Sequence, residues 1–306
     1  MVSVRFGDAR FADDFDISQA TSFIDKTMEE IVLTNVKVRN SETGEWSTVE
    51  LRFQFVVSSQ GLQLSSMATV GDKNIKFVFD SGQDYQEIRD YVAESLDFLK
   101  REAGGSPTDF TVFAFKDLDL LVDAYMSRLN ISLEKREEIR NRWQNGVGEA
   151  GYEHTFLYLG GLWIQKTSLD RLGVVIHELA HVLQSELSGH IGLSSPIWLI
   201  EGVAQATADG MLGRKLKGSP RPPWWDQCNG ITLQNMETRA GAISAEPCPL
   251  DLGLLAVNFM ELPLDKLMGF WGKVGETGDW KKGFYAQFGI SVEQFYADFE
   301  NYRATL

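Results

Sequence analysis

Long apolar segments are missing from this sequence of 306 residues. No run approaches the roughly 20 apolar residues that a transmembrane helix needs, so we expect no membrane span. The first residues, Met1–Asp8, also lack the basic segment followed by an apolar segment that marks a secretory signal. Two interpretations stay open: the protein acts inside the cell, or a leader was removed before this numbering begins.

Basic residues are scarce relative to acidic ones. The chain has 29 Lys and Arg against 43 Asp and Glu, which gives a formal net charge of −14. Such a chain is a poor ligand for nucleic acid or an anionic membrane, because both attract positive charge. We therefore expect no nucleic-acid partner. The balance of 43% hydrophobic and 24% charged residues is ordinary for a folded globular protein and leaves the oligomeric state open.

Cysteine occurs only twice, at Cys228 and Cys248, in one irregular segment. A bridge between them would close a loop of about 20 residues and contribute roughly 3 kcal/mol in the chain-entropy model. Two cysteines confined to one loop favour a disulfide and an oxidising compartment, with two unrelated buried thiols as the alternative. We therefore expect an extracytoplasmic or secreted protein whose leader is absent from this numbering, and a cytoplasmic protein as the alternative.

Histidine is also rare, yet two of the four histidines fall in His177-Glu178-Leu179-Ala180-His181. Apolar residues recur at helical spacing through this stretch, after a capping pattern at Thr167-x-x-Asp170, and predict a helix. Four positions are slightly more than one turn, so His177 and His181 project from the same face. Glu178 lies about 100° around the helix from His177. This arrangement suits zinc-dependent hydrolysis.

Glu201 is the candidate for a third ligand, because a catalytic zinc site normally takes three protein ligands and one water. Ser195-Pro196 predicts the start of a second helix, which returns antiparallel to the first. Glu201 is a charged residue in this otherwise apolar helix, and its burial is costly unless another group pairs with it. A zinc ion would provide that partner.

These residues resemble the gluzincin metallopeptidases, the HExxH…E branch of zinc peptidases. His177-Glu178-x-x-His181 followed by Trp198-x-x-Glu201-Gly202-x-Ala204 is most similar to the peptidase MA-like set. The metzincin branch would instead need Gly and His at the positions of Gln184 and Leu187. The resemblance implies that His177, His181 and Glu201 bind Zn²⁺ and that Glu178 is the general base.

The resemblance also implies a substrate strand just before the metal helix. In gluzincins this strand is the edge of the sheet, and an extended peptide pairs with it. Phe156–Gln165 is the corresponding apolar stretch, with an ordinary buried strand as the alternative. It contains the candidate substrate-binding residues Gly160, Gly161, Leu162 and Trp163. The Gly-x-Met-x-Asn sequence of zinc aminopeptidases is absent from it, so we expect an endopeptidase-type cleft.

Residues that would hydrogen-bond to a metal-bound histidine, the outer-sphere groups, have no exact counterpart of the family pattern in this sequence. Thermolysin-like enzymes place an Asp four residues after the ligand Glu, where this chain has Gln205, and Asp209 lies one turn further. Both are candidates for orienting a ligand histidine. His154 is expected at the surface, with a position that reaches the cleft as the alternative, and His190 is expected in a loop. Gluzincins also supply a His or Tyr that donates to the oxyanion of the tetrahedral intermediate, and because no histidine follows His190, a tyrosine would have to do so here. We do not assign that tyrosine.

The expected fold is α+β, with a zincin-like domain over residues 73–306 and a small β-rich or α+β unit over 1–72. Residues 73–212 would form a small mixed sheet with an edge strand and the metal helices. Residues 213–306 would form a loop, acting as a lid or packing segment over 213–250, and a helical lobe. The pattern predicts these helices: Ser18–Ile31, Tyr85–Arg101, Leu118–Arg128, Leu133–Trp143, Leu254–Met260, Leu264–Val274, Trp280–Phe288 and one capped by Ser291. It predicts strands at Ile31–Val38, Ser47–Val57, Ile75–Phe79 and Phe110–Phe115.

The predicted function is zinc-dependent hydrolysis of a peptide or protein substrate. One alternative is a zincin-fold binding or scaffold protein whose metal is structural or absent. Another is a peptidase that stays latent until the lid or the N-terminal unit moves.

Overall fold

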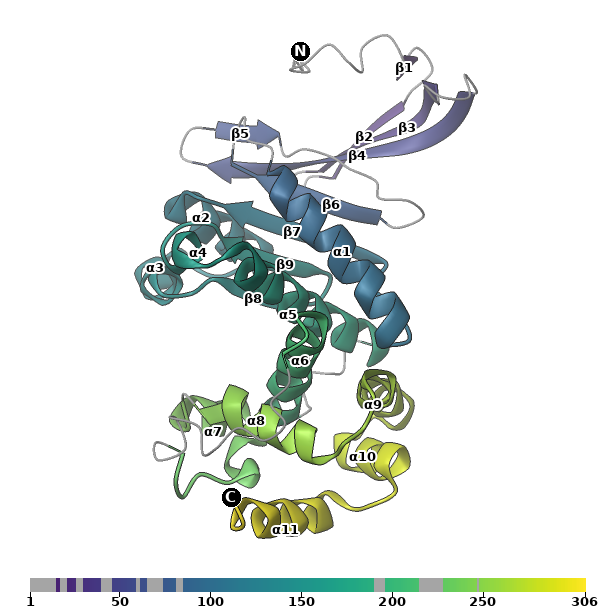
Figure 1. Ribbon diagram of the computed structural model, residues 1–306. Helices are drawn as coiled ribbons and strands as arrows, with labels where there is room; N and C mark the ends of the chain where they lie inside the picture. Colours follow the sequence, from purple (N-terminus) through teal and green to yellow (C-terminus); the bar gives the residue numbers. More distant parts are fainter. Residues whose placement is uncertain are drawn as a thin grey trace.

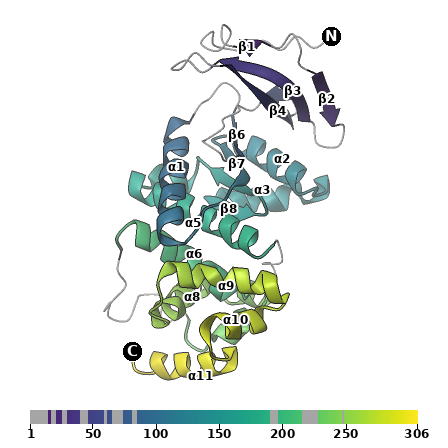
Figure 2. The same cartoon turned by 90° about the vertical axis from the view of Figure 1, so that its right-hand side faces the viewer.

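The computed structural model describes residues 15–16, 21–25, 30–39, 46–58, 61–64, 74–80, 85–189, 196–214, 228–246 and 248–306. These residues form an α+β structure with a small mixed sheet and many helices (Figure 1). Figures 1 and 2 both place an N-terminal sheet at one end, the C-terminal helices at the other, and helices α5 and α6 between them. Within this part of the chain, no helix is both long and apolar enough to cross a membrane.

The N-terminal sheet is antiparallel. Its strands are β1 (Phe15–Asp16), β2 (Thr21–Asp25), β3 (Glu30–Arg39), β4 (Trp46–Ser58) and β5 (Gly61–Leu64). Strand β3 pairs with β1, β2 and β4, and β4 pairs with β5. The strands predicted at Ile31–Val38 and Ser47–Val57 are confirmed as parts of β3 and β4.

The helix predicted over Ser18–Ile31 is wrong where this segment is described. Thr21–Asp25 is strand, and its register places Phe23 opposite Val32 and Ile24 opposite Ile31. Aromatic and β-branched residues favour such cross-strand pairs. Pairing with a neighbouring strand thus overrides a local helical pattern.

The central sheet has the order β6-β7-β9-β8. Strands β6 (Asn74–Phe79), β7 (Asp109–Phe115) and β9 (His154–Tyr158) are parallel, and β8 (Gly148–Gly151) runs antiparallel to β9 at the edge. The strands predicted at Ile75–Phe79 and Phe110–Phe115 are confirmed as β6 and β7.

Helices cover both faces of this sheet. Successive strand residues point to opposite faces, so Phe77 and Val112 join one core, while Val78 and Phe113 join another. The first core includes α1 (Gln86–Glu102) and α5 (Ser168–Leu187), and the second includes α2 (Leu118–Arg128) and α3 (Arg136–Gln144), which follows the short η2 (Leu133–Lys135). The helices predicted at 85–101, 118–128 and 133–143 are therefore confirmed.

The edge strand was predicted in the wrong place. Strand β9 covers the first part of Phe156–Gln165 but lies inside the sheet, and α4 (Leu162–Gln165) covers the last part. The edge position belongs to Gly148–Gly151, a short stretch with no large apolar residue. The edge position was what the family resemblance implied. The alternative, an ordinary buried strand, is confirmed for Phe156–Tyr158, because an apolar run is typical of a strand that is covered on both faces.

The C-terminal lobe is helical. It contains η4 (Leu233–Met236), α7 (Arg239–Ser244), α8 (Cys248–Phe259), α9 (Leu264–Thr277), α10 (Trp280–Phe288) and α11 (Val292–Arg303). Aromatic rings such as Phe270, Phe284 and Phe295 fill its centre, which is continuous with the core under α5 and α6. The helices predicted from Leu254 onward are confirmed, including the Ser291 cap, whose hydroxyl accepts from the Gln294 N–H.

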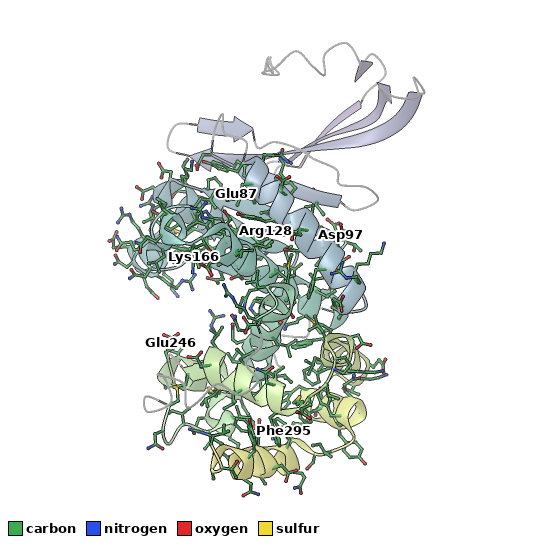
Figure 3. All side chains as sticks on the ribbon, in the orientation of Figure 1. Glu87, Asp97, Arg128, Lys166, Glu246 and Phe295 are labelled. Atoms are coloured by element: carbon green, nitrogen blue, oxygen red, sulfur yellow. A yellow bond between two sulfur atoms is a disulfide. The ribbon has the colours of Figure 1, made fainter. Side chains whose placement is uncertain are left out.

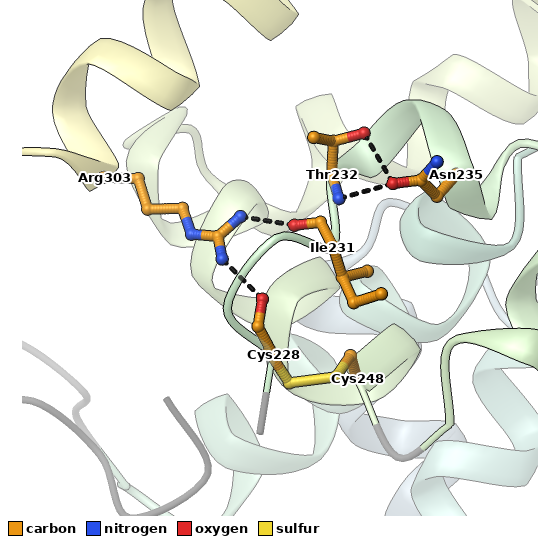
Figure 4. Close-up of a disulfide and its surroundings, with 6 residues drawn as sticks. All are labelled: Cys228, Ile231, Thr232, Asn235, Cys248 and Arg303. Atoms are coloured by element: carbon orange, nitrogen blue, oxygen red, sulfur yellow. Dashed lines mark hydrogen bonds between the residues drawn. A yellow bond between two sulfur atoms is a disulfide. The ribbon is translucent and has the colours of Figure 1, made fainter. Parts of the chain in front are cut away.

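A disulfide organises part of the segment expected to be a long loop (Figure 4). Cys228 and Cys248 are bonded, with Cα atoms 5.7 Å apart. The Arg303 guanidinium donates to the carbonyl oxygens of Cys228 and Ile231. These bonds join the segment to α11, so its described part is ordered by η4 and α7 instead of being irregular. Residues 215–227 of the predicted lid lie outside the described residues.

Candidate metal centre

Two helices bring three ligand atoms together. His177 and His181 project from α5, and Glu201 projects from α6 (Ile197–Met211). The two Nε2 atoms are 3.1 Å apart. Glu201 Oε2 lies 3.3 Å from His177 Nε2 and 3.6 Å from His181 Nε2. The sequence pattern predicted this cluster, and the structure places its three side chains where they could hold one metal ion.

The spacing fits a small divalent metal. Zinc binds imidazole nitrogen and carboxylate oxygen at about 2.0–2.2 Å, so tetrahedral ligand atoms lie roughly 3.3 Å from one another. The three observed separations, 3.1, 3.3 and 3.6 Å, bracket that value. The donor set of two imidazoles and one carboxylate suits zinc and also other first-row metals. The site thus fits a metal ion, and its geometry does not select one element.

The charges around these donors favour a cation. Burial alone would lower the pKa of His181, but the Glu201 carboxylate, helped by Glu178 and Gln184, raises it to about 9. Burial alone would raise the pKa of Glu201, but the two histidines outweigh burial and hold that pKa well below its usual range. The negative charge of Glu201 and Glu178 thus stabilises a positive charge at this cluster, and a metal ion would carry one.

Glu178 lies beside the ligand cluster without belonging to it. It is buried on α5, and this burial raises the pKa of its carboxyl group although His177 and His181 partly oppose the change. The side chain lies against edge strand β8, where a Cβ atom on Gly148 would fall 2.6 Å from Glu178 Oε1. The absence of a side chain at Gly148 therefore makes room for the carboxylate.

The beginning and end of α5 follow local signals. The Thr167 hydroxyl accepts from the Asp170 N–H at 3.2 Å and caps the first turn. Ser188 ends the helix, and Gly189 follows with a φ of +60°, a conformation that glycine adopts without strain. For α6, Pro196 is the N-cap, whereas Ser195 lies outside the described residues.

The Trp198-x-x-Glu201-Gly202 motif packs α6 against the C-terminal lobe. Trp198 stacks on Phe295, which Figure 3 labels in that lobe, with ring centroids 5.6 Å apart. On the next turn, a Cβ atom at Gly202 would fall 2.4 Å from the backbone of Gly253 in α8. The Trp-x-x-Glu-Gly pattern thus holds α6 by an aromatic contact and by a backbone crossing that only glycine permits, and both contacts position Glu201.

The expected outer-sphere groups, Gln205 and Asp209, are hydrogen-bonded to each other, and Asp209 also interacts electrostatically with the ligand His177. Gln205 Nε2 donates to Asp209 Oδ1 at 3.1 Å, and burial raises the pKa of Asp209. Outside the three ligand residues, Gln184 contacts a ligand histidine: its Oε1 lies 2.9 Å from His181 Nδ1. The sequence offered one indication of this contact, because residues three apart on a helix, such as His181 and Gln184, are neighbours on its surface.

The expected substrate-binding residues do not form a strand. Gly160 and Gly161 make the turn before α4, and Trp163 is buried in the core beneath it. Leu162 is exposed at 43%. The predicted pairing of an extended peptide with these four residues is therefore wrong, because their backbone turns and then becomes helical.

The remaining histidines and one tyrosine are also placed. His154, expected at the surface, is buried at the start of β9, where burial and then Arg128 lower its pKa to about 4. His190 lies outside the described residues. Tyr296 accepts from the Trp198 ring N–H and donates to Glu237, so it supports the back of α6.

Comparisons with protein-family models, with curated proteins and with solved structures each gave no match to this chain. The functional interpretation therefore depends on the site itself.

Proposed function

We propose that this protein is a zinc-dependent peptidase of the gluzincin type, with a zincin-like fold most similar to the peptidase MA-like set. The observation that carries the proposal is the arrangement of four side chains. His177, His181 and Glu201 converge within 3.6 Å of one another, while Glu178 is buried next to them and outside the ligand set. A purely structural metal site has no use for this fourth group.

Three of the four side chains would bind the metal, and the fourth would transfer the proton. A zinc ion held by His177, His181 and Glu201 would supply a Lewis acid for the scissile carbonyl and lower the pKa of water toward neutrality. Glu178 takes the proton of the attacking water and returns it to the leaving amine. Its position on the same helix as two of the ligands fixes it relative to the reaction centre.

The edge strand offers a place for the substrate backbone. The Tyr158 N–H donates to the Val147 carbonyl, so by alternation Glu149 and Gly151 bond to β9, and the backbone of Gly148 and Ala150 faces away from it. Among the described strands, β8 has no second neighbour. An extended peptide that pairs with β8 would pass next to Glu178, which supports an endopeptidase acting on peptides or proteins.

A noncatalytic metal-binding protein is the second candidate. The observation that favours it is the position of Gln205, which occupies the place of the thermolysin-like Asp and bonds to Asp209 instead of to a ligand histidine. A latent peptidase is a variant of the first candidate. Limited proteolysis distinguishes it from the noncatalytic protein, because only a latent peptidase would become active after cleavage.

The first test is metal content together with activity. We expect near-stoichiometric zinc in the purified wild type by elemental analysis. We also expect internal cleavage of a complex peptide mixture, read by mass spectrometry, that stops with o-phenanthroline and returns when zinc is added back. A wild type that binds no zinc after reconstitution would contradict the metal site. Zinc binding without cleavage, before and after limited proteolysis, would favour the noncatalytic protein.

Gly148→Ala tests the placement of Glu178. The new Cβ would contact Glu178 Oε1 at 2.6 Å, so the carboxylate must move while the ligand atoms keep their positions. We expect unchanged zinc content and a loss of peptide cleavage on the order of 10²-fold, the cost of a displaced catalytic group. Gly105→Ala is the matched control, because a Cβ there meets nothing within 4 Å. Unchanged cleavage in Gly148→Ala would show that Glu178 does not need this space.

A further inference from the structure

Gln184 connects the two metal helices. It lies on α5 three residues after His181, and only 3% of its surface is exposed. Its Oε1 is 2.9 Å from His181 Nδ1, and its Nε2 donates to the Ile200 carbonyl on α6 at 3.1 Å. One buried side chain therefore contacts a ligand of one helix and the residue before the ligand of the other.

The donors and acceptors available at Ile200, Gln184 and His181 determine which ring nitrogen of His181 carries the hydrogen. The Ile200 carbonyl can only accept, so the amide must present Nε2 to it and Oε1 to His181. Because Oε1 can only accept, Nδ1 of His181 must carry a hydrogen. In the neutral ring, the lone pair is then on Nε2, the atom that faces His177 and Glu201. A carbonyl on α6 thereby sets the tautomer of a histidine on α5.

We infer that Gln184 is a positioning residue of the metal centre. It holds His181 in the tautomer that can bind a metal through Nε2, and it fixes Ile200, and with it Glu201, against α5. This inference rests on the metal site of the proposed function. Outer-sphere partners of metal-bound histidines typically contribute 10- to 100-fold in metal affinity, and we expect a loss of about that size when Gln184 is removed.

A neutral amide suits this position better than a carboxylate does. Glu178, which is buried, and Glu201, which is half-buried, already lie close to His181, and both interact electrostatically with it. A further buried negative charge would repel them. An amide supplies both an acceptor for Nδ1–H and a donor for the Ile200 carbonyl, which a carboxylate cannot do.

The experiment compares zinc affinity in three variants by competition with a chelating dye. Gln184→Met keeps the length of the side chain and removes both bonds. Gln184→Glu restores only the acceptor for Nδ1–H. Gln287→Met is the matched control, because Gln287 Nε2 donates to the Lys266 carbonyl and so joins α10 to α9, two helices that carry no ligand residue. Thermal unfolding is recorded for each, and histidine ¹⁵N NMR of the zinc-loaded wild type reports the His181 tautomer directly.

We expect zinc affinity to fall 10- to 100-fold in Gln184→Met, to fall less in Gln184→Glu, and to stay unchanged in Gln287→Met. In the wild type, we expect Nδ1 of His181 to be protonated. Wild-type affinity in Gln184→Met, or an unprotonated Nδ1, would overturn the inference while leaving the metal site in place. A wild type without zinc would instead overturn the proposed function. If Gln184→Met does not fold, the Gln184→Glu titration and the wild-type spectrum still decide.

Discussion

Glu178→Gln is expected to abolish peptide cleavage while the protein keeps its zinc. The amide has nearly the shape of the carboxylate, so it fits against Gly148, but it cannot take a proton from water. Glu178 is not one of the three atoms that converge on the metal position. The metal and the base are therefore separable by this substitution.

The expected loss is about 10²–10⁴-fold in the rate of cleavage, the usual contribution of general acid–base catalysis. Zinc content by elemental analysis should equal that of the wild type. Glu186→Gln is the control, because Glu186 lies on the same helix and its carboxylate accepts from Thr108 at the surface. Full activity in Glu178→Gln would refute the assigned mechanism.

Glu201→Ala is expected to remove zinc altogether. Two imidazoles one turn apart would remain, and a catalytic site needs three protein ligands to hold the ion firmly. The affinity should fall by more than the roughly 10- to 100-fold that an outer-sphere partner contributes, and cleavage should disappear with the metal.

Elemental analysis of wild type and Glu201→Ala, purified side by side, measures this effect, with Glu186→Ala as the control. Stoichiometric zinc in Glu201→Ala would exclude Glu201 from the ligand set. Together with Glu178→Gln, the result distinguishes a protein that has lost its metal from one that has lost only its base.

Elements with strong local signals were predicted closely. Helix α10 covers Trp280–Phe288 as expected, and α5 begins at the Thr167 cap. Both depend on the spacing of apolar residues and on capping groups, which act over a few residues of chain. Helices whose boundaries are set locally can be located from sequence alone.

Elements defined by distant partners were predicted less well. Thr21–Asp25 became a strand because β3 pairs with it, and β8 became the edge strand because β9 lies between it and β7. Gln205 was expected to orient a histidine, yet its side chain bonds to Asp209. In each case, the outcome depends on contacts whose partners the local sequence does not identify.

The sequence by itself determined the pair His177 and His181 and the position of Glu178, because helix geometry places residues four apart on one face. The approach of Glu201 was decided by the tertiary structure. The packing of α6 on α8 at Gly202, the stacking of Trp198 on Phe295 and the Gln184 bond to Ile200 contribute to its distance from the histidines. Local geometry is fixed by covalent and hydrogen-bond constraints within one helix, whereas the distance between two helices is fixed by the packing of the whole core.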